Sequence, residues 1–334
     1  MKTIKVGCFI PNKNDSTSLY RACGPLSQLS KDYNVQIDYL TGAAWSNLFH
    51  YDVIFMQRPY KPDHMGIAEL VVRLNIPLWL DYDDYLFDVP KDNPAYPAYM
   101  NESARANMTR MLQLADLVTV TNNTLKELYS APGLATNVHV VPNAYDFRFH
   151  HLIHENSGSN LITWRGSKTH DRDVQTYAEP ISAFLRSNPD WEIEFIGELN
   201  CWTLIDSIDP KQVTVTPPMD PFVYMQYLKN LKPSIHIVPL YDNFFNRCKS
   251  NIAWIEATAA GAVALAPKWE DWALEGVMTY ENQDTFLEAL QLAAKHTEGL
   301  KNLHEKSYAL VEEDFNLLKI NQLRYDLLKQ MVDF

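Results

Sequence analysis

The stretch PLYDNFFNRCKSNIAWIEATAAGAVALAP, residues 239–267, decides the fold class. It starts at the end of an apolar segment, 235–240, that has the composition of a buried strand. A polar loop follows, then a predicted helix over 249–260, a break at Gly261 and a second apolar segment over 262–267. A strand, a helix and another strand in this order are typical of a parallel sheet with helices packed on its faces.

The same alternation runs through the whole chain. Strands are predicted over 4–10, 35–40, 52–57, 77–82, 117–121 and 138–143, and then over 160–165, 191–197, 212–217, 235–240, 262–267 and 277–281. The polar residues 150–160 show no periodicity and predict a linker. We therefore expect two Rossmann-like, doubly wound α/β domains that face each other across a cleft. Residues 1–150 form the first, 151–314 the second, and a C-terminal helix over 315–334 crosses back to the first.

Composition limits the classes of function. A chain of 334 residues, with 46% hydrophobic and 21% charged residues, fits two globular domains. The net charge of −12 argues against a broad basic surface for nucleic acid or membrane, although a local basic groove stays open. The four cysteines lie far apart and predict buried thiols. Since the chain has no apolar run of 18 residues, we expect a cytoplasmic protein without a membrane span.

Polar residues directly after strands are the candidate site, because ligands of open α/β sheets lie outside the carboxyl ends of the strands. In 239–267, Ser250 or Asn246 would cap the predicted helix, whose first amides favour an anion, and Lys249 adds a positive charge. Glu256 lies among small and apolar residues and needs a partner there. Ribose hydroxyls would supply one; the alternative is a surface glutamate paired with a lysine.

This segment resembles the donor-binding helix of GT-B glycosyltransferases related to family 4, and most of all their divergent phage-encoded members. In that family a glutamate near the middle of the helix binds the ribose of a nucleotide-sugar, and Glu256 matches it. A second family glutamate lies eight residues earlier, where this chain has Cys248, so Asn246, Lys249 and Ser250 would serve instead. The resemblance implies a UDP-sugar donor, with GDP as the next choice, no cofactor, and retention at the anomeric carbon.

The stretch LITWRGSKTHDRD, residues 161–173, is similar to the G-S-x-x-H-x-x-D turn of the same enzymes. The resemblance implies that this turn binds the donor through Arg165, Gly166, Ser167, Lys168 and His170. Glycine allows a close backbone approach, and the cations offer charge-assisted hydrogen bonds to a diphosphate. The alternative for Asp173 is a helix cap.

In the first domain, PLWLDYDDYLFDVPKDNP, residues 77–94, is similar to a string in phage-encoded members. Four of its carboxylates, Asp81, Asp83, Asp84 and Asp88, cluster after a strand, and we expect one or two of them to face the cleft, with Asp81 and Asp83 as the first choice. With Arg58 at the cleft mouth, they would orient the acceptor hydroxyl or act as the base, which an inverting course would require. The others would cap a helix or pair with Arg58. A D-x-D pattern also suits Mg²⁺ or Mn²⁺. Because GT-B enzymes generally work without a catalytic metal, no metal site is predicted. Ser18 and Arg21, which follow the first strand, would contact phosphate or acceptor.

The sequence therefore predicts a hexosyl- or pentosyltransferase that moves a sugar from a nucleotide-diphosphate sugar to an acceptor hydroxyl. The acceptor stays open: a 5-hydroxymethylpyrimidine in phage DNA, a saccharide, a lipid-linked sugar or a protein. If the chain is phage-encoded, the location is the host cytoplasm. Two other classes remain, a non-catalytic nucleotide-sugar-binding module and a nucleic-acid-binding structural protein.

Overall fold

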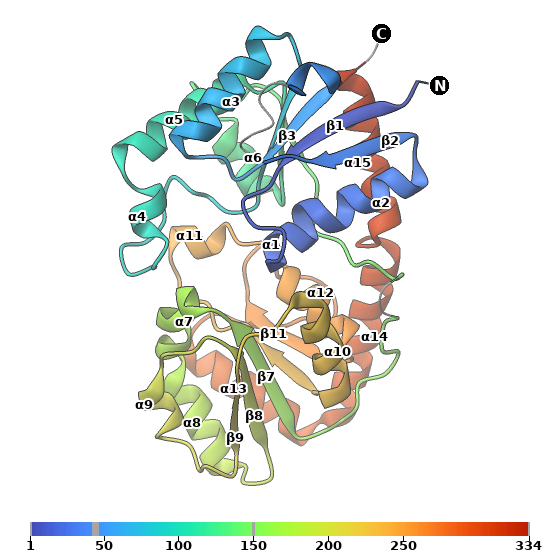
Figure 1. The fold of residues 1–334 in the computed structure, drawn as a ribbon. Helices are drawn as coiled ribbons and strands as arrows, with labels where there is room; N and C mark the ends of the chain where they lie inside the picture. Colours follow the sequence, from blue (N-terminus) through green and yellow to red (C-terminus); the bar gives the residue numbers. More distant parts are fainter. Residues whose placement is uncertain (1, 42–46, 149–150, 333–334) are drawn as a thin grey trace.

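The computed structural model describes residues 2–41, 47–148 and 151–332, and it arranges them in two α/β lobes (Figure 1). Each lobe is built on a six-stranded sheet in which every pair of neighbouring strands is parallel. This confirms the predicted class of two doubly wound α/β domains. In the ribbon the two sheets lie one above the other, with helices on both faces of each.

The first sheet has the order β2-β1-β3-β4-β5-β6. Its strands are β1 (Ile4–Phe9), β2 (Val35–Tyr39), β3 (Val53–Gln57), β4 (Leu78–Tyr82), β5 (Leu117–Val120) and β6 (Val138–Val140). The helices α2 (Gly24–Asp32), α3 (Pro62–Arg73), α5 (Glu102–Leu114) and α6 (Asn123–Tyr129) cover it. The strand order reverses between β1 and β3, and such a switch point opens a crevice at the carboxyl ends of the strands.

The second sheet has the order β12-β11-β10-β7-β8-β9. Its strands are β7 (Leu161–Gly166), β8 (Glu192–Gly197), β9 (Val213–Thr216), β10 (Ile235–Ile237), β11 (Val263–Pro267) and β12 (Met278–Tyr280). The main helices are α8 (Ala178–Ser187), α10 (Pro221–Leu231), α12 (Ile252–Ala259), α13 (Gln283–Lys295) and α14 (Thr297–Glu313). Here the order reverses between β7 and β10.

Every predicted strand is present, and the ends differ where proline intervenes. The strands β6 and β10 end at Val140 and Ile237, earlier than predicted. Pro142 and Pro239 follow shortly after, and a residue without an N–H cannot extend the ladder of hydrogen bonds. The predicted linker is irregular over 151–160, while its first residue lies outside the described residues. The side chain of Asn156 ties it to the second lobe by donating to the carbonyls of Ser234 and Gly261.

The C-terminal helix α15 (Leu317–Met331) crosses back onto the first lobe, as predicted. Its buried face adds Leu317, Ile320, Leu327 and Leu328 to the core between α2 and the first sheet. The amide of Asn321 donates to the carbonyl of Pro25 at 2.9 Å. The predicted boundary at residue 150 falls between β6 and β7 and stays a prediction. In the described part of the chain, no helix has the length and apolar character of a membrane span.

We expect Leu328→Ala to lower the free energy of unfolding by about 2–5 kcal/mol, because it opens a cavity where the helix joins the first lobe. Leu328 is fully buried, whereas Leu318 in the same helix is 53% exposed. The matched control, Leu318→Ala, should change stability by no more than about 0.5 kcal/mol. Urea unfolding of both variants tests this, and equal effects would mean that the helix does not support the lobe as described.

Candidate active site

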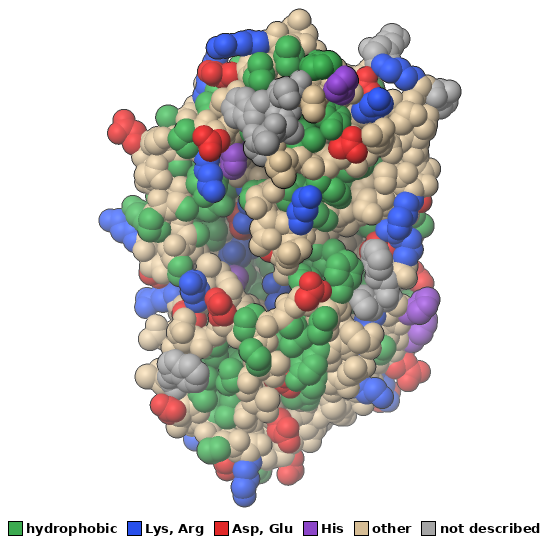
Figure 2. Space-filling view, in the orientation of Figure 1, with side chains coloured by type: hydrophobic (Ala, Val, Ile, Leu, Met, Phe, Trp, Pro, Cys, Tyr) green, Lys and Arg blue, Asp and Glu red, His purple; other side chains and the backbone are tan. Residues whose placement is uncertain are grey.

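A cavity of about 530 Å³ lies between the two lobes, where the carboxyl ends of both sheets meet. Figure 2 shows the hollow at the junction of the lobes, with Lys, Arg and His side chains in its depth. The residues that line it come mainly from the segments after β1, β3 and β4, from the ends of β7, β8 and β10, and from the loop before α12. Of the predicted site residues, the cavity is lined by Arg58, Asp83, Arg165, Gly166, Ser167, His170, Lys249 and Ser250.

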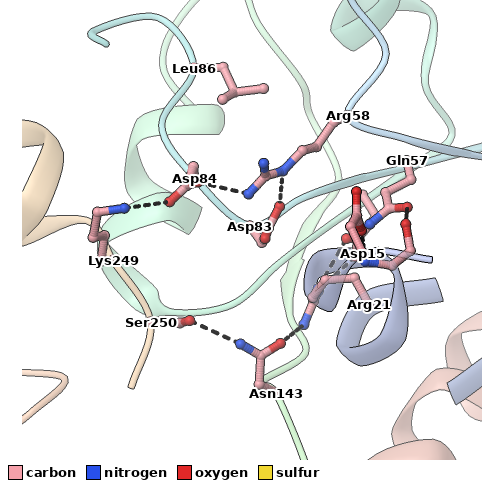
Figure 3. A network of polar contacts seen from close by, with 12 residues as sticks. Asp15, Arg21, Gln57, Arg58, Asp83, Asp84, Leu86, Asn143, Lys249 and Ser250 are labelled. Carbon is pink, nitrogen blue, oxygen red and sulfur yellow. Dashed lines mark hydrogen bonds and ion pairs between the residues drawn. The ribbon is translucent and has the colours of Figure 1, made fainter. Parts of the chain in front are cut away.

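Arg58 organises the wall of the first lobe. It pairs with Asp83 through Nε and with Asp84 through Nη2, the latter at 2.7 Å (Figure 3). Its backbone is left-handed, with φ +44°, and its amide donates to the carbonyl of Asp81 at 2.9 Å. A left-handed residue other than glycine costs about 1–2 kcal/mol, so this geometry is held by the contacts that it makes possible.

The pKa values of the two neighbouring carboxylates, Asp83 and Asp84, shift in opposite directions. Burial raises the pKa of Asp83, although Arg58 works against that shift. Burial also acts on Asp84, but there Lys249 and Arg58 outweigh it, and the pKa of Asp84 falls below its ordinary value. Asp84 is thus a permanent hydrogen-bond acceptor near neutral pH, whereas Asp83 accepts a proton more readily than an ordinary aspartate.

Lys249, from the second lobe, lies next to this wall of the cavity. Its Nζ lies 3.8 Å from Asp84 Oδ1 and 4.8 Å from the centre of the Phe245 ring. Next to it, Ser250 Oγ accepts a hydrogen bond from Asn143 Nδ2 at 2.9 Å (Figure 3). A cation whose nearest carboxylate is this far away keeps hydrogen-bonding capacity for a ligand.

On the second lobe, Arg165 Nε donates to Glu256 Oε2 at 2.7 Å. Glu256 is buried behind Arg165, whose guanidinium lines the cavity. The prediction that this carboxylate needs a partner is confirmed, and the alternative of a surface glutamate paired with a lysine is wrong. Burial and the charge of Glu256 also raise the pKa of Tyr20, a residue of the first lobe. Glu256 therefore lies where the two lobes approach each other.

His170 and Asp173 form a further polar pair at the cavity. The ring nitrogen Nδ1 lies 2.8 Å from Asp173 Oδ2. Asp173 Oδ1 accepts hydrogen bonds from the Asn246 amide at 2.6 Å and from the Tyr241 backbone at 3.2 Å. Asp173 thus orients His170, in addition to lying in the first turn of the following helix, α7 (Asp171–Thr176).

The predicted cap of the donor helix requires a correction. α12 begins at Ile252, its N-cap residue is Asn251, and no side chain caps it. Asn246 belongs to the separate short helix α11 (Phe244–Arg247) and is buried on Asp173, outside the cavity. Lys168 is exposed and also lies outside the cavity. Ser250 lines the cavity, but it does not cap a helix; its hydroxyl accepts a hydrogen bond from Asn143.

Asp81, Arg21 and Ser18 do not line the cavity, contrary to expectation. Arg21 Nη2 and Nε bind both oxygens of Asp81, at 2.6 and 3.0 Å, and Thr119 Oγ1 donates to Asp81 at 2.6 Å. Ser18 is buried and donates to Gln57 Oε1 at 2.9 Å. The reason is that β4 continues through Tyr82, so Asp81 is still inside the sheet and only Asp83 and Asp84 follow its end. The buried pair supports the wall from behind.

Other residues that line the cavity were not predicted as site residues, among them Tyr99, Thr169, Tyr224 and His236. His236 lies within β10, buried beside Thr163, and burial followed by the charge of Arg165 lowers its pKa to about 3. A polar residue inside an apolar strand was the available signal for it. Among the described residues, no group of three or more His, Cys, Asp and Glu is placed to hold a metal ion.

Comparison with solved structures identifies the fold. The chain superposes on sucrose-phosphate synthase from Thermosynechococcus elongatus with a TM-score of 0.71 at 13% identity, covering 98% of this chain and 99% of that one. Anabaena HepE in complex with UDP-glucose gives 0.69 at 12% identity, with 98% and 100% covered. The UDP-GlcNAc 2-epimerase of Neisseria meningitidis, bound to UDP-GlcNAc, gives 0.57 at 11% identity, with 98% and 100% covered.

The chain therefore has the two-domain GT-B fold, as predicted. No protein-family model matches its sequence, and no curated protein matches it in sequence. Sequence identities this low support the fold alone, so the reaction has to be inferred from the residues of the site.

We expect Asp81→Asn to lower the free energy of unfolding by about 3–5 kcal/mol, because Arg21 would keep its charge in a buried position without a carboxylate. The control is Glu179→Gln, which breaks an exposed pair with Arg186 and should cost no more than about 1 kcal/mol. Urea unfolding compares the two variants. Loss of ligand binding by Asp81→Asn with unchanged stability would instead place Asp81 in the site.

Proposed function

We propose that the chain is a glycosyltransferase that binds a nucleotide-diphosphate sugar in the cavity and transfers the sugar to an acceptor hydroxyl. The observation that carries this proposal is the meeting of Arg165, Lys249 and His170 at one cavity between the carboxyl ends of two parallel sheets. The fold is shared with HepE, whose crystal contains UDP-glucose. The arginine and the lysine supply positive charge at this edge, which is suited to a diphosphate.

The donor is assigned to the second lobe. Its diphosphate lies between Arg165 and Lys249. A ribose hydroxyl replaces Arg165 as the hydrogen-bond donor to Glu256. UDP is the first choice of nucleotide and GDP the second. We assign neutralisation of the leaving diphosphate to these cations, so that the reaction needs no catalytic metal.

The acceptor approaches from the first lobe, near Asp83. The acceptor oxygen bonds to the anomeric carbon as the bond from that carbon to the diphosphate oxygen breaks. The nucleotide diphosphate leaves with the electron pair, and the hydroxyl proton passes to Asp83 or to the leaving oxygen. We propose retention at the anomeric carbon, by resemblance to family 4. NMR of the product linkage decides, since a β product from an α donor excludes retention.

The first acceptor to test is a 5-hydroxymethylpyrimidine in DNA, by resemblance to phage-encoded members. In a duplex such a base has to leave the stack to reach Asp83. A saccharide is the second acceptor, because Tyr99 and Leu86 give this part of the cavity an apolar and aromatic surface.

Thermal shifts with UDP-, GDP- and ADP-sugars test donor binding. We expect a UDP-sugar at 100 times its dissociation constant to stabilise the protein by about 2.7 kcal/mol, and Glu256→Gln to lose most of that gain. Glu179→Gln, far outside the cavity, should keep it. If none of the nucleotide-sugars shifts the wild type, the proposed function fails.

Turnover tests the acceptor side. We expect Asp83→Asn to reduce the rate of UDP release with an accepted substrate by about 10²–10⁴-fold, because a base or orienting carboxylate is lost. Donor affinity should remain within about threefold, since Arg58 keeps its pair with Asp84. Donor binding without turnover on any acceptor of the panel, by the wild type itself, would favour the binding-module alternative.

A further inference from the structure

His170 presents a mismatch to any phosphate that enters the cavity. Its Nδ1 faces Asp173 Oδ2 at 2.8 Å, while the other oxygen of that carboxylate already accepts two hydrogen bonds. An ionised carboxylate only accepts, so the ring must donate from Nδ1. In the neutral imidazole the remaining nitrogen, Nε2, then carries a lone pair. Since His170 lines the cavity, that lone pair is the one left for a ligand.

A diphosphate oxygen is also an acceptor. Two acceptors repel each other at hydrogen-bond distance, unless a proton lies between them. We propose that His170 takes up one proton when the donor binds, and that the resulting imidazolium donates from Nε2 to a diphosphate oxygen, with Asp173 as the positioning residue. This inference rests on the proposed function and assigns to His170 a change of protonation when the donor binds.

The charged groups around the His170 ring determine in which direction its pKa shifts. Lys249 and Arg165 from the second lobe, Asp173 from the next helical turn and Asp84 from the first lobe all act on His170. Without a ligand, burial and then Lys249 lower the pKa of His170 below its ordinary value, so the ring is neutral near pH 7. A diphosphate brings two negative charges, which offset the cations and raise that pKa. Donor affinity therefore falls as the pH rises through the pKa of the bound form.

The proton that His170 takes up also contributes to the transfer step. When the bond between the anomeric carbon and the diphosphate oxygen breaks, the leaving diphosphate gains one negative charge. An imidazolium already hydrogen-bonded to it stabilises that charge without any movement of the protein. Arg165, whose pKa is raised by Glu256, keeps its charge, whereas His170 makes the stabilisation dependent on pH.

Calorimetry with UDP-glucose tests the proposal. Its diphosphate is a diester without a proton that titrates near neutrality, unlike the terminal phosphate of UDP, so any proton taken up enters the protein. Titrations at pH 7.0 in buffers of different ionisation enthalpy count the protons. We expect roughly 0.5–1 proton per UDP-glucose for the wild type, and an affinity that falls by up to about tenfold per pH unit above neutrality.

Three variants separate His170 from its surroundings. His170→Gln keeps a hydrogen-bond donor without a titrating group, so it should bind UDP-glucose with no proton uptake. Asp173→Asn keeps the acceptor for Nδ1 but removes its charge, so uptake should shift to lower pH. The control His139→Gln, on β6 outside the cavity, should behave as the wild type.

The outcomes are distinct. UDP-glucose binding to the wild type without proton uptake overturns this inference and leaves the proposed function intact. Uptake that survives in His170→Gln overturns it too and points to another group of the cavity, such as His236. An absence of UDP-glucose binding to the wild type overturns the proposed function for a uridine donor, and the inference with it.

Discussion

The cleft depends on the contact that holds the segment Phe244–Ser250 of the second lobe against the first lobe. Asn122 Nδ2 donates to the carbonyl of Cys248 at 3.1 Å, while its Oδ1 caps α6. The Cys248 side chain is fully buried in the core cluster of the first lobe, and the rings of Phe244 and Tyr85 meet edge to face at 5.8 Å. A thiol packed in this way behaves as a small apolar side chain, which explains why position 248 contributes no polar group to the cavity.

This contact determines which charges meet. Because the segment is docked, Lys249 comes within reach of Asp84 and of His170, and Ser250 reaches Asn143. Buried charges require partners, and residues around the cavity supply them: Asp83 and Asp84 for Arg58, and Glu256 for Arg165. Lys249 has the longest of these ion-pair distances. A ligand with negative charge would therefore disturb the pairing least by binding there first.

The sequence was sufficient for the fold because the strands are marked by apolar runs and the helices by amphipathic segments between them. It was also sufficient for Arg58 and Asp83, which directly follow strands, and for Arg165 at the carboxyl end of β7. It failed for Asp81 and Arg21, since a difference of two positions separates a carboxylate inside β4 from one beyond its end. It also failed for Asn246, because a contact with Asp173, which is distant in the chain, holds that side chain outside the cavity. Pairing between residues that are distant in the chain leaves no mark in a single sequence.

The neighbouring carboxylates Asp83 and Asp84 differ because only Asp84 faces a second cation. Arg58, which pairs with both Asp83 and Asp84, directly follows β3 and has a left-handed backbone. Asp84 also faces Lys249 and stays ionised, whereas Asp83 lacks a second cation among its principal partners and has a raised pKa. Two carboxylates whose pKa values are moved apart are suited to different tasks, one to hold a hydroxyl and the other to exchange a proton. Replacement of Arg58 would remove a cation that lowers the pKa of both carboxylates and would leave Lys249 beside Asp84. The left-handed conformation of Arg58 is therefore better explained by the chemistry of the cleft than by stability.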